Sequence, residues 1–205
     1  MDLTQQPLAD RGARRSRSAH LARVILREPF RAGTWRRTAY ILLALPVGLL
    51  CLPLALVGGP AGRIQRGLAR RLLHLDVGEP PRTGPVALAH AVISTPLNLI
   101  AVMTSGYFWT IVVINFGFPL RIDGDPSHSW GGPTMAGAWA VHAAGGGVTF
   151  LFLTPWVVKG FTALQARLVS GFLGTDRTGL LRTTGIALGV AAVCAVLSVP
   201  IIHQL

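Results

Sequence analysis

Two histidines are the side chains that could do chemistry inside the apolar parts of this chain. His90 and His142 lie in two long apolar segments, where polar groups are costly to bury and are therefore often functional. If those segments pair, the two imidazoles could approach each other and bind haem or a metal ion. No cysteine or carboxylate lies in register with them, and a single histidine that hydrogen-bonds to a neighbouring helix is the commoner case. We therefore expect no metal and no cofactor.

Two asparagines, Asn98 and Asn115, lie in the same apolar segment as His90. Asparagine side chains in membrane segments commonly form hydrogen bonds between helices. We expect that role for both, in preference to an ion path. The candidate intramembrane polar residues are thus His90, Asn98, Asn115 and His142.

The stretch RIDGDPSHSWGGP, which begins at Arg121, is the polar connection between two long apolar segments. Its Asp123, Asp125, His128 and Trp130 could hold a cation or sense an extracellular signal. The same residue types also form ordinary turns, and the spacing of a calcium-binding EF-hand does not follow. A signal-sensing loop and a plain loop both stay open, and the composition favours the plain loop.

Catalytic motifs are missing from the sequence. It contains no HExxH motif and no arrangement typical of a Ser-His-Asp triad. The apolar segments contain no Asp or Glu, which argues against proton-coupled transport and intramembrane aspartyl chemistry. The run Gly145 to Gly147 is not a phosphate-binding loop, because no Lys-Ser or Lys-Thr follows it. We expect that the protein is not an enzyme.

Membrane helices must position these residues. Of 205 residues, 51% are hydrophobic and only 13% are charged, which is too apolar for an ordinary soluble domain. A helix needs about 20 apolar residues to cross the hydrocarbon core of a bilayer. The sequence therefore predicts an all-α, multi-pass membrane protein. Its apolar segments span residues 39–59, 85–120, 135–158 and 180–202.

The positive charges predict how these segments are oriented. Almost all of the 19 lysines and arginines lie in residues 1–37, 63–82 and 159–182, which the positive-inside rule places in the cytoplasm. The stretch that begins at Arg121 holds one arginine and two aspartates, so it is predicted outside. We expect a multi-pass protein of the cell membrane with a cytoplasmic amino end and an extracytoplasmic carboxyl end.

The same basic residues suggest lipid partners. Arginines beside apolar segments attract anionic headgroups, so the net charge of +11 requires no nucleic-acid partner. No basic groove motif with interleaved aromatic residues is present, and we expect no nucleic-acid binding. The expected headgroup contacts on the cytoplasmic side are Arg63, Arg66, Arg70, Lys159 and Arg167.

The first apolar segment conflicts with these charges. A single crossing would separate residues 1–37 from 63–82, although both are predicted to be cytoplasmic. We expect Pro46, Pro53 and several glycines to interrupt a helix in this segment. We therefore expect a re-entrant hairpin in which Tyr40 to Pro53 enters and leaves on one side, with a full span as the alternative.

Two stretches of the chain are alike. LPLALVGGPAGRIQRGLARRLLHLD ends at Asp76, and FLTPWVVKGFTALQARLVSGFLGTD ends at Asp176. Each joins an apolar, proline-containing run to an amphipathic helix, and such helices lie in the plane of the membrane interface. This predicts a degenerate internal repeat with two amphipathic interfacial helices. Their apolar faces comprise Ile64, Leu68, Leu72 and Leu75 in the first and Phe161, Leu164, Leu168 and Phe172 in the second.

These stretches resemble a known family. REPFRAGTWRRTAYILLALPVG, the LPLALV run and LTPWVVKGFTALQARLVSGFLG are similar to the sensor domain found at the amino end of many actinobacterial histidine kinases and in stand-alone membrane proteins. The resemblance covers roughly residues 25–176. It implies a twofold repeat of a helical hairpin followed by an amphipathic cytoplasmic helix.

The chain departs from that family in two ways. The first half lacks one of the two spans, and a further apolar segment stands where a kinase would carry its dimerisation helix and phosphoacceptor histidine. The resemblance therefore implies no kinase chemistry. The expected organisation is a cytoplasmic tail (1–24), a sensor-like membrane domain (25–176) and an additional carboxyl-terminal transmembrane helix (177–205).

Two functions stay open at this point. One is a non-enzymatic membrane sensor that couples a membrane or extracellular signal to cytoplasmic partners. The other is a structural accessory subunit or transporter-like component of a larger membrane complex. The expected partners are anionic lipids together with a cytoplasmic regulator, a membrane complex or a second copy of the chain.

Overall fold

The computed structural model describes residues 18–80, 84–121, 125–175 and 177–202, with side chains to Leu197. Within these ranges the regular structure is helical and contains no strand. After a helical stretch over residues 18–27, the elements are η1 (Glu28–Phe30), α2 (Ala32–Leu56), α3 (Ala61–Leu73), α4 (Gly84–Phe116), η2 (Phe118–Leu120), α5 (Met135–His142), η3 (Ala143–Val148), α6 (Thr149–Leu173) and α7 (Leu180–Ile202).

Four helical stretches are long and apolar enough to cross a membrane within the described residues. They are Ala32–Leu56, Gly84–Phe116, Met135–Leu173 and Leu180–Leu197. The all-α class predicted from the sequence is therefore confirmed for the described residues, and these four helices are compatible with a membrane location.

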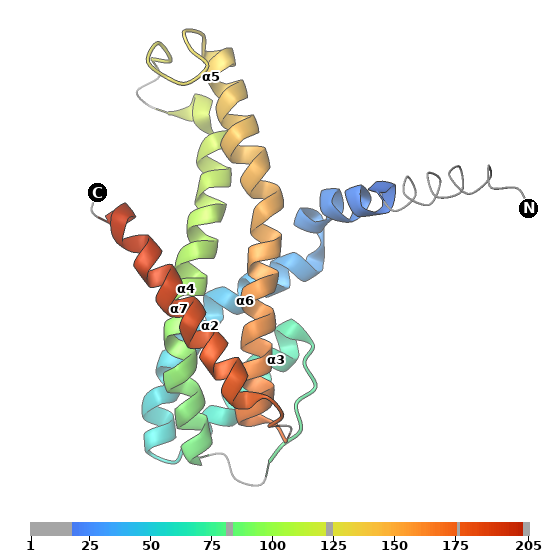
Figure 1. Cartoon of the computed structure of the whole chain (residues 1–205), viewed down its shortest axis with the longest axis vertical. Helices are drawn as coiled ribbons and strands as arrows, with labels where there is room; N and C mark the ends of the chain where they lie inside the picture. The colour runs from blue at the N-terminus through green and yellow to red at the C-terminus, as the bar shows by residue number, and fades with distance from the viewer. Residues whose placement is uncertain (1–17, 81–83, 122–124, 176, 203–205) are drawn as a thin grey trace, which may run out of the picture.

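The centre of the fold is an antiparallel pair made of α4 and the continuous stretch α5–η3–α6 (Figure 1). At one end of the pair, Phe108 packs edge-on against Phe150, with ring centroids 4.8 Å apart. The π-helical turn η3 contains three successive glycines, and the side chain of Asn115 lies directly against Gly146. The absence of a side chain at Gly146 therefore allows α4 to approach η3 closely.

Helix α2 packs against α4 and is inclined to the α4–α6 pair in Figure 1. It runs unbroken from Ala32 to Leu56 through Pro46 and Pro53. The expectation that the chain reverses between Tyr40 and Pro53 is therefore wrong. A proline removes one backbone donor and can kink a helix. Inside a membrane protein, neighbouring helices can supply partners for the backbone groups that a proline leaves unpaired, so a helix can continue through it.

The reversal occurs after α2, at a short turn that leads into α3. Gly58 adopts φ +72°, a left-handed conformation that favours glycine, and Pro60 precedes the first residue of α3. Helix α3 then returns beside α2, and the Arg36 guanidinium near the start of α2 contacts the imidazole of His74, which follows α3. The two helices thus form an antiparallel hairpin whose ends lie together.

The two stretches that looked alike in sequence differ in structure. In the first, α2 and α3 are separate helices joined by a turn. In the second, α6 continues without a break through Pro155 to Leu173. Of the apolar face expected for α3, Leu68, Leu72 and Leu75 are partly buried against the core and Ile64 is 40% exposed, and the buried residues of the helix include Ala61, Gln65 and Ala69.

Helix α7 crosses the α4–α6 pair obliquely and packs against both helices (Figure 1). Its contact with α6 is close at Gly171, where a methyl group would lie 2.7 Å from Leu180 Cδ1. The largest fully buried side chains of the core include Ile41, Leu97 and Leu168, which come from α2, α4 and α6. The core therefore lies where these three helices meet, which is also where the polar residues described next are found.

Candidate functional site, a buried polar network

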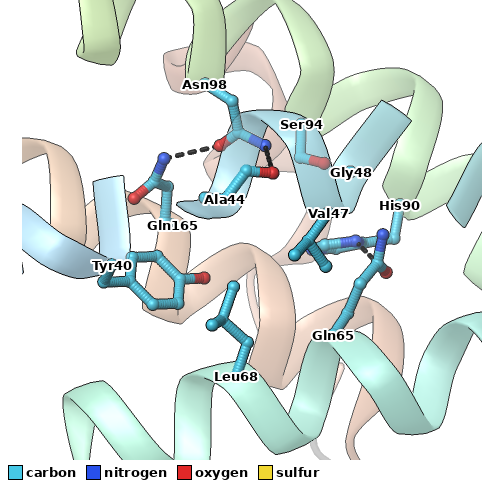
Figure 2. A pocket seen from close by; sticks show the side chains of 10 residues that line it. All are labelled: Tyr40, Ala44, Val47, Gly48, Gln65, Leu68, His90, Ser94, Asn98 and Gln165. Carbon is cyan, nitrogen blue, oxygen red and sulfur yellow. Dashed lines mark hydrogen bonds between the residues drawn. The ribbon is translucent and has the colours of Figure 1, made fainter. Parts of the chain in front are cut away.

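A set of polar side chains is buried where α2, α3, α4 and α6 meet. Each helix contributes at least one member, and Figure 2 shows them around a small cavity. Polar groups inside a helical membrane protein are stable only when they find partners, so their arrangement constrains how the four helices pack. The polar members are Tyr40, Gln65, His90, Ser94, Asn98 and Gln165.

Asn98 connects three helices. Its Nδ2 donates to the backbone oxygen of Ala44 on α2 at 3.1 Å, and its Oδ1 accepts from Gln165 Nε2 on α6 at 2.5 Å. A backbone carbonyl can only accept, so the Ala44 oxygen fixes the orientation of the Asn98 amide and, through it, that of Gln165. Gly48 lies beside this amide, where a methyl group would be 3.3 Å from Nδ2.

His90 connects α4 to α3. Its Nδ1 lies 2.7 Å from Gln65 Oε1, and the imidazole also packs edge-on against Phe172 of α6. With Gln65 Oε1 as the acceptor, Nδ1 carries the proton and Nε2 presents a lone pair. The ring is therefore held between α3 and α6 by one hydrogen bond and one aromatic contact.

The cavity beside these residues is about 20 Å³, which is enough for one water molecule. His90 Nε2 and Gln165 Oε1 are buried and have no hydrogen-bond partner within the described structure. The Tyr40 hydroxyl points toward the same space in Figure 2. The arrangement can hold a small molecule that donates hydrogen bonds, but it does not present the several ligands that a metal ion needs.

Arg66 adds a second link between α3 and α6. Its side chain is only 4% exposed, and its Nη1 donates to the backbone oxygen of Leu173 at 3.2 Å. Leu173 ends α6, so this oxygen is one of the carbonyls that have no partner within the helix. Arg66 Nη2 lies 3.8 Å from Glu79 Oε1, but Glu79 is 63% exposed, so the contact with the α6 end is the better shielded of the two.

His142 and Asn115 lie near the other end of α4. His142 stacks on Phe118 with ring centroids 4.1 Å apart and bonds to the Ala138 oxygen in its own helix. Asn115 also bonds within its own helix, to the oxygen of Ile111. Because His90 and Phe118 are separated by most of α4, His142 and His90 are about 40 Å apart and cannot share a ligand.

The part of the α4–α5 connection that follows η2 is mostly exposed within the described residues. Asp123 lies outside the described residues. Asp125 accepts hydrogen bonds from the backbone N and Oγ of Ser127, at 2.9 and 2.8 Å, and these bonds lower the pKa of its carboxyl group. His128 and Trp130 are exposed, and Trp130 is 83% exposed. Among the described residues no group of three or more His, Cys, Asp or Glu could hold a metal ion.

The basic residues expected at headgroups fall into two sets. The guanidinium of Arg66 is turned into the protein, as described above, because it caps α6. Arg70 is half exposed and lies 3.9 Å from Glu79, while Lys159 lies over the ring of Trp156. The exposed members of the expected set are Arg63, Arg70, Lys159 and Arg167.

Sequence reasoning missed Gln65 and Gln165, although both are almost fully buried. The helical spacing of the sequence could have indicated that both glutamines are buried. Gln165 shares the face of α6 that carries Phe161, Leu168 and Phe172, and Gln65 shares the small-residue face of α3 that carries Ala61 and Ala69. A glutamine on a buried face is a candidate for a buried hydrogen bond.

No family model, no curated protein and no solved structure matches this chain. The polar network is therefore interpreted from its own geometry.

Proposed function

We propose that this protein is a non-enzymatic membrane sensor, in which a change in the packing of the membrane helices is transmitted to α3 and from there to a cytoplasmic partner. One observation supports this most directly. The basic helix α3 is attached to α4 by the Gln65–His90 hydrogen bond and to α6 by the Arg66–Leu173 hydrogen bond. A relative movement of α4 and α6 would pull on both attachments.

In this proposal, the cytoplasmic partner would bind the exposed surface of α3 and the loop that follows it. Arg63, Arg70 and Arg71 are exposed there, and Glu79 adds an acidic group. Such a surface can bind an acidic partner or anionic headgroups. The proposal includes the orientation that the charges favour, with α3 in the cytoplasm and the carboxyl end of α7 outside.

The resemblance to the actinobacterial sensor domain agrees with this role. In the same proposal, α3 and the second half of α6 correspond to the two interfacial helices of a degenerate repeat. The exposed Ile64 of α3 would then rest against lipid, while the small face of α3 packs on the other helices.

The test uses two neighbouring glycines in η3. A side chain at Gly146 would collide with Asn115, whereas a methyl group at Gly145 meets nothing within 4 Å. Gly146→Ala should therefore push α4 and α6 apart at the end far from α3, and Gly145→Ala is the matched control. Hydrogen–deuterium exchange in lipid nanodiscs would measure the backbone protection of residues 61–73.

A sensor predicts faster exchange in α3 for Gly146→Ala and unchanged exchange for Gly145→Ala. If the Gly146→Ala effect stays within α5, η3 and the adjacent end of α4, the proposed transmission is wrong. Purification of the wild type in mild detergent adds a second criterion. A stable stoichiometric complex with a permease or a respiratory enzyme would favour the accessory-subunit function instead.

A further inference from the structure

The structure has a second hollow, between α6 and α7, whose wall is basic and hydroxylated. It measures about 600 Å³. Arg167 and Ser170 come from α6, and Arg182 and Thr183 come from the first turn of α7. Among the described residues, neither Arg167 nor Arg182 forms an ion pair with an acid. The amino end of α7 adds its positive helix dipole to the same wall.

An apolar groove continues from this hollow along the same two helices. It measures about 430 Å³ and is lined almost entirely by apolar groups. Arg167 and Ile186 line both spaces, so the groove and the basic hollow adjoin. The remaining lining of the groove comprises Val157, Gly160, Phe161, Ala163, Leu164 and Val190.

We propose that the α6–α7 hollow and groove bind one anionic phospholipid, with its phosphate at Arg167 and Arg182 and an acyl chain along Gly160. Both helices are long and apolar enough to lie in the membrane, so a phospholipid is the molecule that would meet this surface there. The basic and apolar spaces match the two chemical halves of such a lipid, and paired guanidinium groups suit a phosphate.

The dimensions agree with this occupant. The distance along α6 from Arg167, where the two spaces adjoin, to Val157 is about 15 Å at a rise of 1.5 Å per residue, so the groove can hold much of one extended acyl chain. Gly160 has no atom within 4 Å of the position its Cβ would take, so the groove is open at this point. The site goes beyond the sensor proposal and does not depend on it.

Native mass spectrometry of the full chain, extracted in mild detergent and equilibrated with defined lipids, tests the site. The wild type should retain one phosphatidylglycerol and should retain phosphatidylcholine far less. Arg167→Gln with Arg182→Gln should reduce phosphatidylglycerol binding about thirtyfold, since each arginine near the surface contributes about a factor of five. Arg177→Gln controls for the loss of one positive charge nearby, because Arg177 is exposed and does not line the hollow, and each single variant, Arg167→Gln or Arg182→Gln, is compared with it.

A second variant blocks the groove and leaves both arginines in place. Gly160→Leu should fill the open space beside α7 and release the lipid, and the fold should tolerate the change because a Cβ at position 160 meets no atom within 4 Å. Gly185→Leu is the control, since Gly185 is also open and lies on α7 outside both linings. Circular dichroism and size-exclusion profiles establish that each variant is folded.

Any one of the following results would overturn the proposal. The wild type could retain no lipid, or retain phosphatidylcholine as well as phosphatidylglycerol. The arginine pair or Gly160→Leu could bind phosphatidylglycerol as the wild type does. Millimolar glycerol 3-phosphate could displace the lipid headgroup, which would indicate a site for a soluble phosphate. Gly160→Leu could convert a dimer to a monomer, which would make the groove an interface between two copies of the chain.

Discussion

Asn98 is the single residue that contacts the most helices through hydrogen bonds in the network. It bonds to the backbone of α2 and to Gln165 of α6, while belonging to α4. Asn115, in contrast, bonds only within α4. The two asparagines looked equivalent in the sequence, and their difference arises from which neighbours face each position.

Replacing Asn98 by alanine should therefore destabilise the protein more than replacing Asn115. Two interhelical bonds are lost and the Gln165 amide loses its partner, so the free energy of unfolding should fall by about 1–3 kcal/mol. Asn115→Ala should change it by less than about 1 kcal/mol. Reversible unfolding in mixed detergent micelles measures both, and equal effects would show that the Asn98 network does not hold the helices together.

Asp125 provides a prediction about pH. The hydrogen bonds from Ser127 favour its charged form, so the pKa of the carboxyl group is lowered. The Asp125–Ser127 turn should therefore be lost at a lower pH than that at which an ordinary aspartate becomes protonated. Carbon-13 NMR titration of the Asp125 carboxyl would measure this. Ser127→Ala should move the pKa back up, and an unchanged value would exclude the side-chain bond.

At the scale of the elements, the contacts of Arg66 help to hold α3 in position. Arg66 is turned inward and caps the end of α6, while its partner Glu79 is largely exposed. A buried guanidinium that bonds to an otherwise unpaired carbonyl should matter more than its exposed ion pair.

Arg66→Met and Glu79→Gln separate the two contributions. Arg66→Met keeps the apolar stem but leaves the Leu173 oxygen without a donor, and should lower the free energy of unfolding by about 1–3 kcal/mol. Glu79→Gln should lower it by less than about 1 kcal/mol. Thermal unfolding in detergent compares them, and a larger effect of Glu79→Gln would reverse the assignment.

At the scale of the whole molecule, the ends of the α2–α3 hairpin determine the topology. The start of α2 lies beside the residue that follows α3, through the contact between Arg36 and His74. We therefore expect both ends on the cytoplasmic side, although the reversal occurs at Gly58 and not between Tyr40 and Pro53.

Single cysteines test this topology after Cys51 and Cys194 are replaced. Cysteines at Arg31 and Glu79 should both react with a membrane-impermeant maleimide only from the cytoplasmic face, and a reporter fused after Leu205 should lie outside. Labelling at position 31 from the outer face together with position 79 from the inner face would show that α2 crosses the bilayer once.

The length of the α4–α6 pair also bears on the membrane. Helix α4 has 33 residues and so measures about 50 Å, whereas the hydrocarbon core is about 30 Å thick. Part of the pair must extend beyond the hydrocarbon or the helices must tilt. The basic residues near the α3 end, including Arg167, favour extension on that side.

The sequence by itself determined the helical class and the positions of the apolar helices. Those properties depend on the hydrophobicity and length of a segment, such as 85–120, and both can be read from the segment alone. It also identified His90 and Asn98, because a polar residue in an apolar stretch stands out.

Only the tertiary structure decided which polar groups meet. The pairings of Gln65 with His90, of Gln165 with Asn98 and of Arg66 with Leu173 join residues that are 25, 67 and 107 positions apart. Each depends on the register and rotation of one helix against another, which many weak packing contacts set together. For the same reason the continuous path of α2 through two prolines followed from its neighbours, and local helix propensity alone predicted a break.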